Sequence, residues 1–355
     1  MECLVQDVDV VLVGAGPIGL ELAVVLKRMG VEYAHVEAGQ IGQTITGYPR
    51  QVRFFSSPER IAIAGVPLHT TDQSKATREE YLAYLRSVVE QYGLAVRAYE
   101  RVVSLSRDDT SGRWIVRTQR GGGDEHAWSA RSVVLAIGDM HQPRMLHIPG
   151  EDLPHVSHVF EDPHPFFQQR LVIVGGRNSA VEAALRCHRA GAHVTLSYRR
   201  DSFDRDAIKY WLLPEIESLI KAGQITFLPR TRPVAITREH VALAGDAQEL
   251  GTRKVPADFV LLLTGYVQDT SLFEMAGVEL RGENRAPVVD PDTMQANVPG
   301  LYIAGTAAAG TQVRFRLFIE NCHPHVARIA RALTGREPPT GLINDAVAAF
   351  KLPES

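Results

Sequence analysis

The sequence predicts an α/β protein made of two parallel-sheet domains, the second of which is inserted into the first. Two observations carry this prediction: a strand, a glycine turn and a helix follow one another at residues 8–30, and a similar unit recurs at residues 170–201. The length agrees, because 355 residues are long for a single compact domain. Strands that alternate with helices are typical of three-layer folds built on a parallel sheet.

The first unit begins with the apolar, β-branched run VDVVLV at residues 8–13, which predicts a buried strand. The turn GAGPIG follows at 14–19, and LELAVVLKRMG at 20–30 has helical spacing. The next strand, YAHVE, ends on Glu37, where a carboxylate accepts hydrogen bonds from an adenosine ribose. Strand, turn, helix and acid together predict a Rossmann-like dinucleotide site rather than an ordinary glycine turn.

The glycines of this first turn have three different predicted roles. Gly14 permits the tight turn, Gly16 lets the backbone approach a pyrophosphate, and Gly19 lets the helix and the strand pack closely. The helix N-terminus that follows presents its N–H groups to the phosphates.

The second unit has a weaker fingerprint. Gly175 and Ala180 occupy the first and third glycine positions, but Arg177 stands where the second glycine usually lies. The strand after it ends in Arg199 and Arg200 instead of an acid. Guanidinium groups attract a 2′-phosphate, which an acid would repel, so the second site is predicted to bind NADPH. The alternative is that the two arginines belong to a solvated turn.

Three further apolar strands end in glycine, at residues 133–138, 259–265 and 300–305. Each is expected to close a dinucleotide domain or to bring the backbone past a cofactor. Small residues at a strand end permit that close approach.

A linker rich in Pro, Gly and His follows the first of these strands, at residues 141–155. It marks the predicted point at which the inserted domain begins. The first dinucleotide domain is therefore expected to comprise residues 1–143 and 268–355, and the second residues 144–267.

Composition and charge argue against several classes of protein. Lysine and arginine total 38 against 41 aspartate and glutamate, so no basic excess favours a nucleic acid or an anionic membrane as partner. No apolar run of about eighteen residues is present and the N-terminus lacks a basic signal region, so a cytoplasmic location is expected. The linker histidines lack a completing carboxylate or cysteine, so no metal site is expected.

The chain contains three cysteines, Cys3, Cys187 and Cys322, and no Cys-x-x-Cys pair. They are too few and too far apart for a disulfide framework, which fits a reducing compartment. Cys322 lies just ahead of Pro324, which suits the first position of a helix. A helix N-terminus lowers the pKa of a nearby thiol, which would make Cys322 a reactive thiol. The alternative is that Cys322 is a small, buried packing residue, as free cysteines often are.

Two dinucleotide sites in one chain resemble the arrangement of the thioredoxin-reductase-like flavoproteins, which bind FAD in the first site and a nicotinamide in the second. The resemblance is carried by GAGPIG, Glu37, AIG at 136–138, LLTG at 262–265 and YIAG at 302–305. Four longer segments are similar to the bacillithiol disulfide reductases, also called bacilliredoxin reductases: YPRQVRFFSSPERIAIAGVPL (48–68), HPFFQQRLVIVGGRNSAVEAAL (164–185), IKYWLLPEI (208–216) and FIEN (318–321).

The glycine patterns and the resemblance together assign residues to the two sites. The FAD site is expected to contain Gly14, Gly16, Pro17, Ile18, Gly19, Glu37, Gln43, Phe55, Ser56, Val102, Ala136, Gly138, Gly305 and Thr306. The NADPH site is expected to contain Gly175, Gly176, Arg177, Asn178, Ser179, Arg199, Arg200, Lys209, Thr264 and Gly265. The resemblance also implies that Glu320 and Asn321, which are candidate catalytic residues, reach toward the isoalloxazine ring.

The chain departs from its apparent relatives at the positions of their thiols. Thioredoxin reductases carry a Cys-x-x-Cys in the nicotinamide domain, whereas Cys187 has no partner cysteine in sequence. The bacillithiol branch places a cysteine inside the first glycine turn, where this chain has Ile18. Thr306 stands where thioredoxin reductases usually have an aspartate for the ribityl chain of FAD. Because Cys322 directly follows Glu320 and Asn321, it is the candidate catalytic thiol that would accept electrons from the flavin, and packing beside the ring is the alternative.

These features predict an NADPH-dependent FAD oxidoreductase in which hydride passes from nicotinamide to flavin and electrons then leave to an acceptor. The resemblance implies that the acceptor is a low-molecular-weight thiol disulfide, or a mixed disulfide on a small redoxin, and that the enzyme is a homodimer. The alternative is a thiol-free electron transferase similar to the ferredoxin-NADP reductases, which would serve ferredoxin or flavodoxin. A flavin monooxygenase and a flavin-binding redox sensor also stay open.

Overall fold

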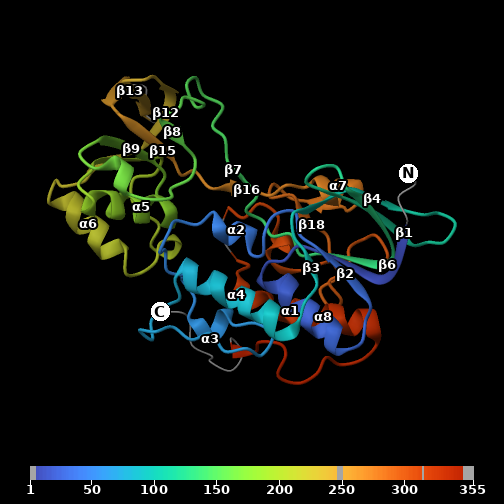
Figure 1. Ribbon diagram of the computed structural model, residues 1–355. Helices are drawn as coiled ribbons and strands as arrows, with labels where there is room; N and C mark the ends of the chain where they lie inside the picture. Colours follow the sequence, from blue (N-terminus) through green and yellow to red (C-terminus); the bar gives the residue numbers. More distant parts are fainter. Residues whose placement is uncertain (1–4, 246–250, 314–315, 347–355) are drawn as a thin grey trace. The chain divides into compact units, whose positions relative to one another are not determined.

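The structure, a computed structural model, describes residues 5–245, 251–313 and 316–346 (Figure 1). The chain divides into two compact units. The first comprises Met1–Thr46, Gln51–Gln142 and Tyr266–Glu354, and the second comprises Pro143–Gly265 together with Gly47–Arg50. No sequence pattern predicts that the short piece 47–50 groups with the second unit, where the backbone N–H of Arg50 donates to the carbonyl of Glu161 at 3.1 Å.

The first unit is built on a seven-stranded sheet in the order β3-β2-β1-β6-β5-β4, with β19 also paired to β6. Strands β1, β2, β3, β6 and β19 run parallel, and β4 and β5 add an antiparallel extension to β6. The carboxyl ends of β1, β6 and β19 are in register, so the glycine turns that follow them lie side by side. The strands are β1 Val5–Val13, β2 Tyr33–Val36, β3 Val96–Arg97, β4 Glu100–Arg107, β5 Trp114–Arg120, β6 Glu125–Leu135 and β19 Leu301–Ile303.

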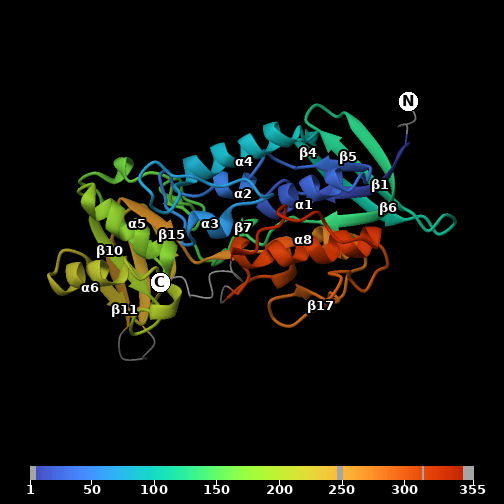
Figure 2. The ribbon, with the colours of Figure 1, turned by 90° about the horizontal axis from the view of Figure 1, so that it is seen from below.

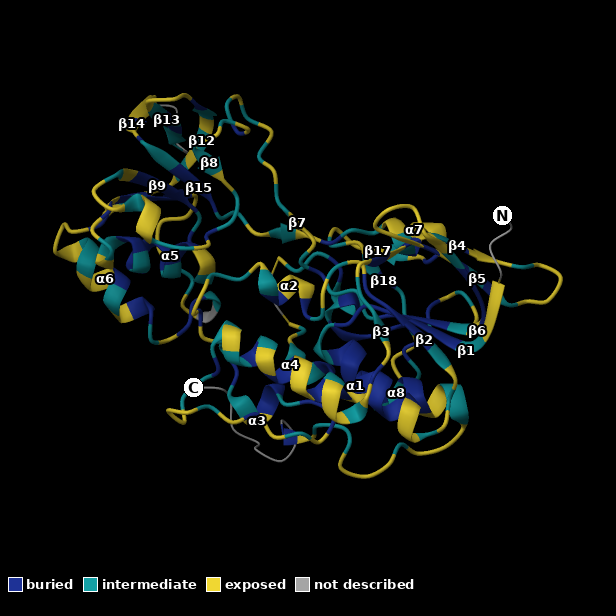
Figure 3. Ribbon diagram, viewed as in Figure 1, coloured by how far each residue is buried: buried dark blue, intermediate teal, exposed yellow. Residues whose placement is uncertain are grey.

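Helix α1 is the most buried helix of the first unit (Figure 3). Every residue from Ile18 to Leu26 is buried, because α1 contacts both α4 and α8 (Figure 2). Helix α4, in contrast, alternates buried and exposed residues and begins at a capping box between Thr77 and Glu80. The helices are α1 Pro17–Arg28, α2 Gln43–Thr46, α3 Pro58–Ile61, α4 Arg78–Tyr92, α7 Ser271–Met275, the 3₁₀ helix η4 Gly305–Ala309 and α8 Ile319–Thr334.

The second unit has a five-stranded parallel sheet in the order β11-β10-β9-β15-β8. Residues of β9 alternate between two cores: Leu171 and Ile173 pack with α5, and Val172 and Val174 pack with β13. The elements are β8 Val156–Ser157, η1 His164–Phe166, β9 Arg170–Val174, α5 Asn178–Arg189, β10 His193–Tyr198, η2 Arg205–Ala207, α6 Leu213–Lys221, β11 Thr226–Pro229, β12 Thr231–Ile236, β13 His240–Gly245, β14 Thr252–Pro256 and β15 Phe259–Leu262. This three-layer arrangement confirms the predicted α/β fold with two Rossmann-like units.

Short strand pairs complete the described part of the chain. Strand β7 pairs with β16 where the chain passes between the units, and β17 pairs with β18 in the first unit. Their bounds are β7 Gln142–Pro143, β16 Tyr266–Val267, β17 Leu280–Arg281 and β18 Ala286–Pro287.

Helix α8 begins at Ile319, so Pro324 lies inside the helix and the predicted helix start is wrong. The reason is a cap that the spacing alone does not reveal: the backbone N–H of Phe318 donates to the side-chain oxygen of Asn321 at 2.8 Å. A proline this close to a helix N-terminus removes a single intrahelical hydrogen bond, which the packed helix tolerates here. Cys322 consequently belongs to the first turns of α8.

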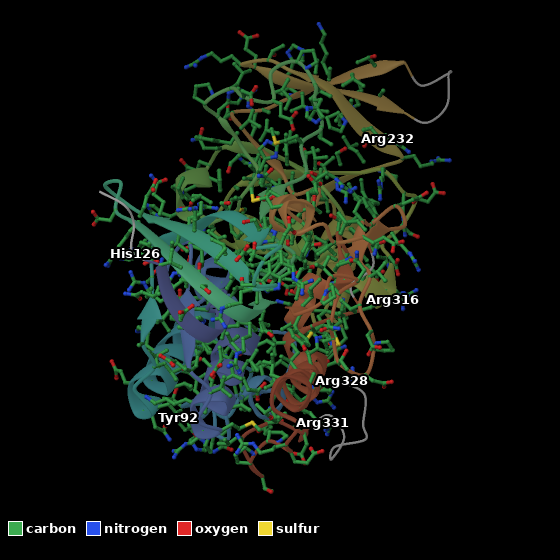
Figure 4. All side chains as sticks on the ribbon, turned by 90° about the vertical axis from the view of Figure 1, so that its right-hand side faces the viewer. Tyr92, His126, Arg232, Arg316, Arg328 and Arg331 are labelled. Carbon is green, nitrogen blue, oxygen red and sulfur yellow. The ribbon has the colours of Figure 1, made fainter. Side chains whose placement is uncertain are left out.

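A buried ion pair between His323 and Glu21 joins α8 to α1. Figure 4 labels two other residues of α8, Arg328 and Arg331. The Nδ1 atom of His323 lies 2.6 Å from Glu21 Oε2, and its Nε2 lies 3.0 Å from the carbonyl oxygen of Arg60. Both partners accept hydrogen bonds, so the ring carries two protons and a positive charge. Burial alone would lower the pKa of His323, but the hydrogen bond and the charge of Glu21 outweigh it and raise the pKa.

The His323→Gln variant is expected to lower the free energy of unfolding by about 3 kcal/mol near pH 6, because the Glu21 carboxylate is then left buried without its cation. Since the pKa of His323 is raised above its unfolded value of about 6.5, this stabilisation is complete below that value and disappears as pH rises through the folded pKa. Urea unfolding of both proteins across this range measures the difference. The exposed His193→Gln variant is the control, and a difference that stays constant with pH contradicts the ion-pair account.

Candidate active site

The first glycine turn joins β1 to α1, and Gly16 is the N-cap of the helix. A Cβ atom on Gly14 would lie 2.4 Å from the carbonyl oxygen of Ala136, and one on Gly19 would lie 2.1 Å from the carbonyl oxygen of Gly14. At Gly16, in contrast, nothing lies within 4 Å of that position. Packing therefore requires two of the glycines, whereas the third borders open space at a helix N-terminus, which fits a bound pyrophosphate.

Glu37 follows β2 and its side chain is held at the same edge of the sheet. Its Oε2 accepts the backbone N–H of Ala15 at 2.7 Å, and its Oε1 accepts that of Gly39 at 2.7 Å. Each oxygen retains a lone pair, so the carboxylate is fixed in position and can still accept a ribose hydroxyl.

Strands β6 and β19 are each followed, within three residues, by a glycine. Gly138 and Gly305 have φ angles of +77° and +72°, which favour glycine. A Cβ on Gly305 would lie 3.4 Å from that of Ile18, and one on Gly138 would meet nothing closer than Thr306 Oγ1 at 3.9 Å. The structure thus brings Ile18, Gly138, Gly305 and Thr306 together at the carboxyl ends of the strands, where open α/β sheets bind ligands.

Two buried histidines that no motif indicated hold these turns in place. His35 Nε2 donates to the carbonyl oxygen of Gly14 at 2.9 Å, and His325 Nδ1 accepts the backbone N–H of Gly305 at 3.2 Å. Burial lowers the pKa of each histidine to about 4. Both rings are therefore neutral near pH 7, and each has a fixed tautomer.

The remaining candidates for the FAD site lie elsewhere in the first unit. Gln43 begins α2, and its side-chain oxygen accepts the backbone N–H of Gln40 at 3.1 Å. Ser56 is buried, whereas Val102 packs in the core on β4. The ammonium of Lys75 lies 5.1 Å from the centre of the Phe55 ring. No contact in the described residues assigns these side chains a role, so their part in FAD binding stays a prediction.

The amide of Asn321 is committed to the structure of the segment ahead of α8. Its oxygen accepts the N–H of Phe318 at 2.8 Å, and its Nδ2 donates to the carbonyl of Arg316 at 2.7 Å. Glu320 Oε2 lies 3.8 Å from Nη1 of Arg60, so the two form an ion pair with little exposure to solvent. Asn321 is thus a positioning group for this segment, and the catalytic roles of both residues stay predictions.

The thiol of Cys322 is fully buried. Burial raises its pKa, and the negative charges of Asp139 and Glu21 add to that effect. The lowering expected from a helix N-terminus is outweighed, which supports the packed alternative for this cysteine. Cys187 is also buried on α5, and its pKa is raised to about 12 by burial. Cys3 lies outside the described residues.

The second glycine turn joins β9 to α5 in the second unit. A Cβ on Gly175 would lie 2.5 Å from the carbonyl oxygen of Leu263, and one on Gly176 would lie 2.4 Å from the ring of Tyr198. Arg177 is the N-cap of α5, in place of the usual glycine. Burial lowers its pKa, and the charges of Arg200 and Arg199 lower it further, although Tyr198 opposes them.

Three guanidinium groups thus influence one another at the ends of β9 and β10. Of these, Arg200 Nη1 forms an ion pair with Asp204 Oδ2 at 3.2 Å, and the side chain of Arg199 is exposed. A site with mutually repelling cations gains stability from an anion, and a 2′-phosphate has the charge and the oxygen geometry that arginine prefers.

The other candidates of the NADPH site have mixed surroundings. The ammonium of Lys209 is buried 2.9 Å from Glu182 Oε2, and Asn178 Oδ1 accepts its backbone N–H at 2.6 Å. These contacts favour a structural role for both side chains. Thr264 donates to the carbonyl of Arg144 at 2.8 Å, and a Cβ on Gly265 would meet nothing within 4 Å. Ser179 is exposed near the N-terminus of α5.

Comparison with known proteins defines the class. Residues 11–305 match the pyridine nucleotide-disulphide oxidoreductase family, and the chain belongs to that family. It is 35% identical over 327 residues to bacilliredoxin reductase Bdr of Bacillus subtilis, which covers 92% of this chain and 98% of the relative. It is 29% identical over 301 residues to a ferredoxin-NADP reductase of Ignicoccus hospitalis, covering 84% of this chain and 89% of the relative.

Solved structures give the same result. The bacillithiol disulfide reductase Bdr of Bacillus cereus has a TM-score of 0.87 and 34% identity, covering 94% of this chain and all of the other. The Staphylococcus aureus protein of the same name has a TM-score of 0.85 and 32% identity, covering 93% and 99% of the two chains. A T. acidophilum thioredoxin reductase, at 22% identity and a TM-score of 0.70 over 92% and 98% of the chains, shares the fold.

These matches confirm the predicted resemblance to the bacillithiol disulfide reductase branch. The protein is an FAD-dependent pyridine nucleotide oxidoreductase, and FAD and NADPH are its cofactors. Among the residues that the structure describes, no helix is long and apolar enough to cross a membrane. The same residues contain no cluster of three side chains suited to hold a metal ion.

The Gly16→Ala and Gly19→Ala variants are expected to distinguish a glycine needed for FAD binding from a glycine needed for packing of the protein. In Gly16→Ala the added methyl group enters the open space at the helix N-terminus, so the Kd for FAD rises at least about tenfold. Stability of its apoprotein changes by no more than about 1 kcal/mol. In Gly19→Ala the methyl group meets the Gly14 carbonyl and costs about 1–3 kcal/mol of apoprotein stability. FAD titration and urea unfolding measure both quantities, and equal loss of stability in the two variants contradicts the distinction.

Removal of both Arg199 and Arg200 is expected to raise the KM for NADPH about tenfold or more, because charge-assisted hydrogen bonds to a phosphate contribute about 1.5–3 kcal/mol. The KM for NADH, which lacks the phosphate, should change little. Steady-state kinetics of the double alanine variant measures both, with the exposed Arg238→Ala variant of the β12-β13 hairpin as control. A parallel rise for both nucleotides would show that the arginines do not select the phosphate.

Proposed function

We propose that this enzyme uses NADPH to reduce a low-molecular-weight thiol disulfide of the bacillithiol type, or the mixed disulfide of such a thiol on a small redoxin. NADPH, one proton and the disulfide give NADP⁺ and two thiols. The observation that carries the proposal is the 35% identity, over 92% of the chain, to a bacilliredoxin reductase.

FAD, when bound, supplies the two-electron chemistry between NADPH and the acceptor. The residues of the chain bind and orient the two cofactors. The turn at Gly16 and the N-terminus of α1 would receive the pyrophosphate, and Glu37 would receive the adenosine ribose. In the second unit, Arg177 and its neighbours Arg199 and Arg200 would receive the 2′-phosphate.

We propose that neither cysteine among the described residues relays the electrons. The turn that holds a cysteine in the bacillithiol branch holds Ile18 here, and both cysteines among the described residues are buried. Burial raises the pKa of each thiol, and a protonated thiol is a poor nucleophile. Bound FAD would then supply electrons to the disulfide without a relay through Cys187 or Cys322.

The Cys322→Ser variant is therefore expected to retain NADPH-driven disulfide reduction within about twofold of the wild type, because no thiolate is lost. Anaerobic titration of the wild type should show no long-wavelength charge-transfer band between thiolate and flavin. Cys187→Ser is the matched control. A band that vanishes in Cys322→Ser, together with loss of disulfide reduction, would restore Cys322 as the working thiol.

A second candidate function is electron transfer to ferredoxin or flavodoxin. The 29% identity to a ferredoxin-NADP reductase, over 84% of this chain, favours it. Stopped-flow assays that offer bacillithiol disulfide, a bacilliredoxin mixed disulfide and ferredoxin to the NADPH-reduced enzyme distinguish the two. Faster turnover with ferredoxin than with either disulfide would replace the first proposal by the second.

We also propose that the enzyme acts in the cytosol as a homodimer. Its low cysteine content supports a reducing compartment, and the dimer rests on the family resemblance. Light scattering after gel filtration should give about twice the chain mass of 39.1 kDa. A mass equal to one chain would refute the dimer.

A further inference from the structure

Asp139 follows Gly138 at the carboxyl end of β6, and no sequence motif singled it out. Its side chain is only 7% exposed. Its Oδ2 accepts a hydrogen bond from Gln312 Nε2 at 2.9 Å, and the hydroxyl of Thr306 also donates to the carboxylate. Burial raises the pKa of Asp139, and these two hydrogen bonds oppose the rise. The buried carboxylate of Asp139 therefore lies close to Thr306, a residue of the proposed FAD site.

The order of the strands places Asp139 relative to the first glycine turn. The neighbours run β2, β1, β6, with β19 also on β6, so Glu37 and Asp139 lie on opposite sides of the turn after β1. A dinucleotide whose pyrophosphate sits at that turn extends to both sides of it. With its adenosine ribose at Glu37, such a dinucleotide would have its other half on the side of Asp139 and Thr306.

The chemistry of a carboxylate limits what it can contact in FAD. It repels the phosphates and accepts hydrogen bonds from hydroxyl groups. On the side of the pyrophosphate away from Glu37, the first hydrogen-bond donors of FAD are the hydroxyls of the ribityl chain, and the N3–H of the isoalloxazine ring lies beyond them. We propose that Asp139 is a further cofactor-positioning residue, whose carboxylate accepts a hydrogen bond from the ribityl chain of FAD.

Asp139 also anchors the segment that leads to α8. Gln312, its partner, accepts the backbone N–H groups of Arg316 at 2.8 Å and Leu317 at 3.0 Å. The other hydrogen bond of its Nε2 goes to the carbonyl of Leu317 at 3.0 Å. Loss of Asp139 would thus disturb this segment as well, and the experiment has to separate that effect from a contact with the ribityl chain.

Binding of FAD and of ADP to the apoprotein makes the separation. ADP has the adenosine and the pyrophosphate but lacks the ribityl chain and the flavin. The Asp139→Ala variant is expected to raise the Kd for FAD about tenfold, or about 1.4 kcal/mol, with the Kd for ADP unchanged. Flavin fluorescence quenching measures the first and calorimetry the second. Asp109→Ala, at an exposed loop position, is the matched control.

The Gln312→Ala variant removes the anchor of the segment and keeps the carboxylate, so its Kd for FAD should rise less than that of Asp139→Ala. Asp139→Asn, which is isosteric and keeps one acceptor oxygen, is expected to fall between wild type and Asp139→Ala. It is the variant to score if the alanine protein does not fold. Equal weakening of FAD and ADP, no change in either, or an effect in Gln312→Ala as large as in Asp139→Ala would overturn the proposal. None of these measurements depends on which acceptor the enzyme reduces.

Discussion

The packing of the first glycine turn against the ends of two strands is the constraint on which the flavin-binding unit depends. At Gly14 and Gly19 the carbonyl oxygens of Ala136 and Gly14 occupy the space of a side chain. This contact sets how closely α1 approaches β1 and β6, and so determines where the N–H groups at the start of α1 point. The buried Glu21 and His323 then fix α8 to the same helix.

The second unit meets the same constraint with different residues. Gly175 is required by the carbonyl of Leu263, and Gly176 by the ring of Tyr198. Its N-cap, however, is Arg177, which carries charge where the first turn leaves open space at Gly16. The two proposed sites thus differ in physical means: FAD would be held by close approach to backbone, and NADPH by an arginine cluster that its extra phosphate would neutralise.

The elements that the sequence predicts correctly are those encoded by residues close together in the chain. Strand, turn and helix follow from a few consecutive residues, and the two dinucleotide units were identified from them. The features that were missed join distant residues: Glu21 and His323 are 302 positions apart, and Asp139 and Gln312 are 173 apart. The helix start predicted at Pro324 is wrong because the cap by Asn321 depends on the path of the chain ahead of α8. The ion pair between the loop residue Lys209 and Glu182 on α5 likewise has no signal in the sequence. The roles of Phe55, which lies on a loop, and of Gln43, which begins the short helix α2, have no such pattern to test them.

The burial of the two described cysteines affects how readily their thiols are oxidised. Peroxides attack exposed thiolates and convert them stepwise to sulfenic, sulfinic and sulfonic acids. Cys187 and Cys322 are buried, and their raised pKa values keep them protonated near pH 7. Low-molecular-weight disulfides accumulate when a cell is exposed to oxidants, and these two side chains offer such oxidants no reactive sulfur. The proposed disulfide reductase would thereby resist, at these two positions, the oxidants that produce its substrate.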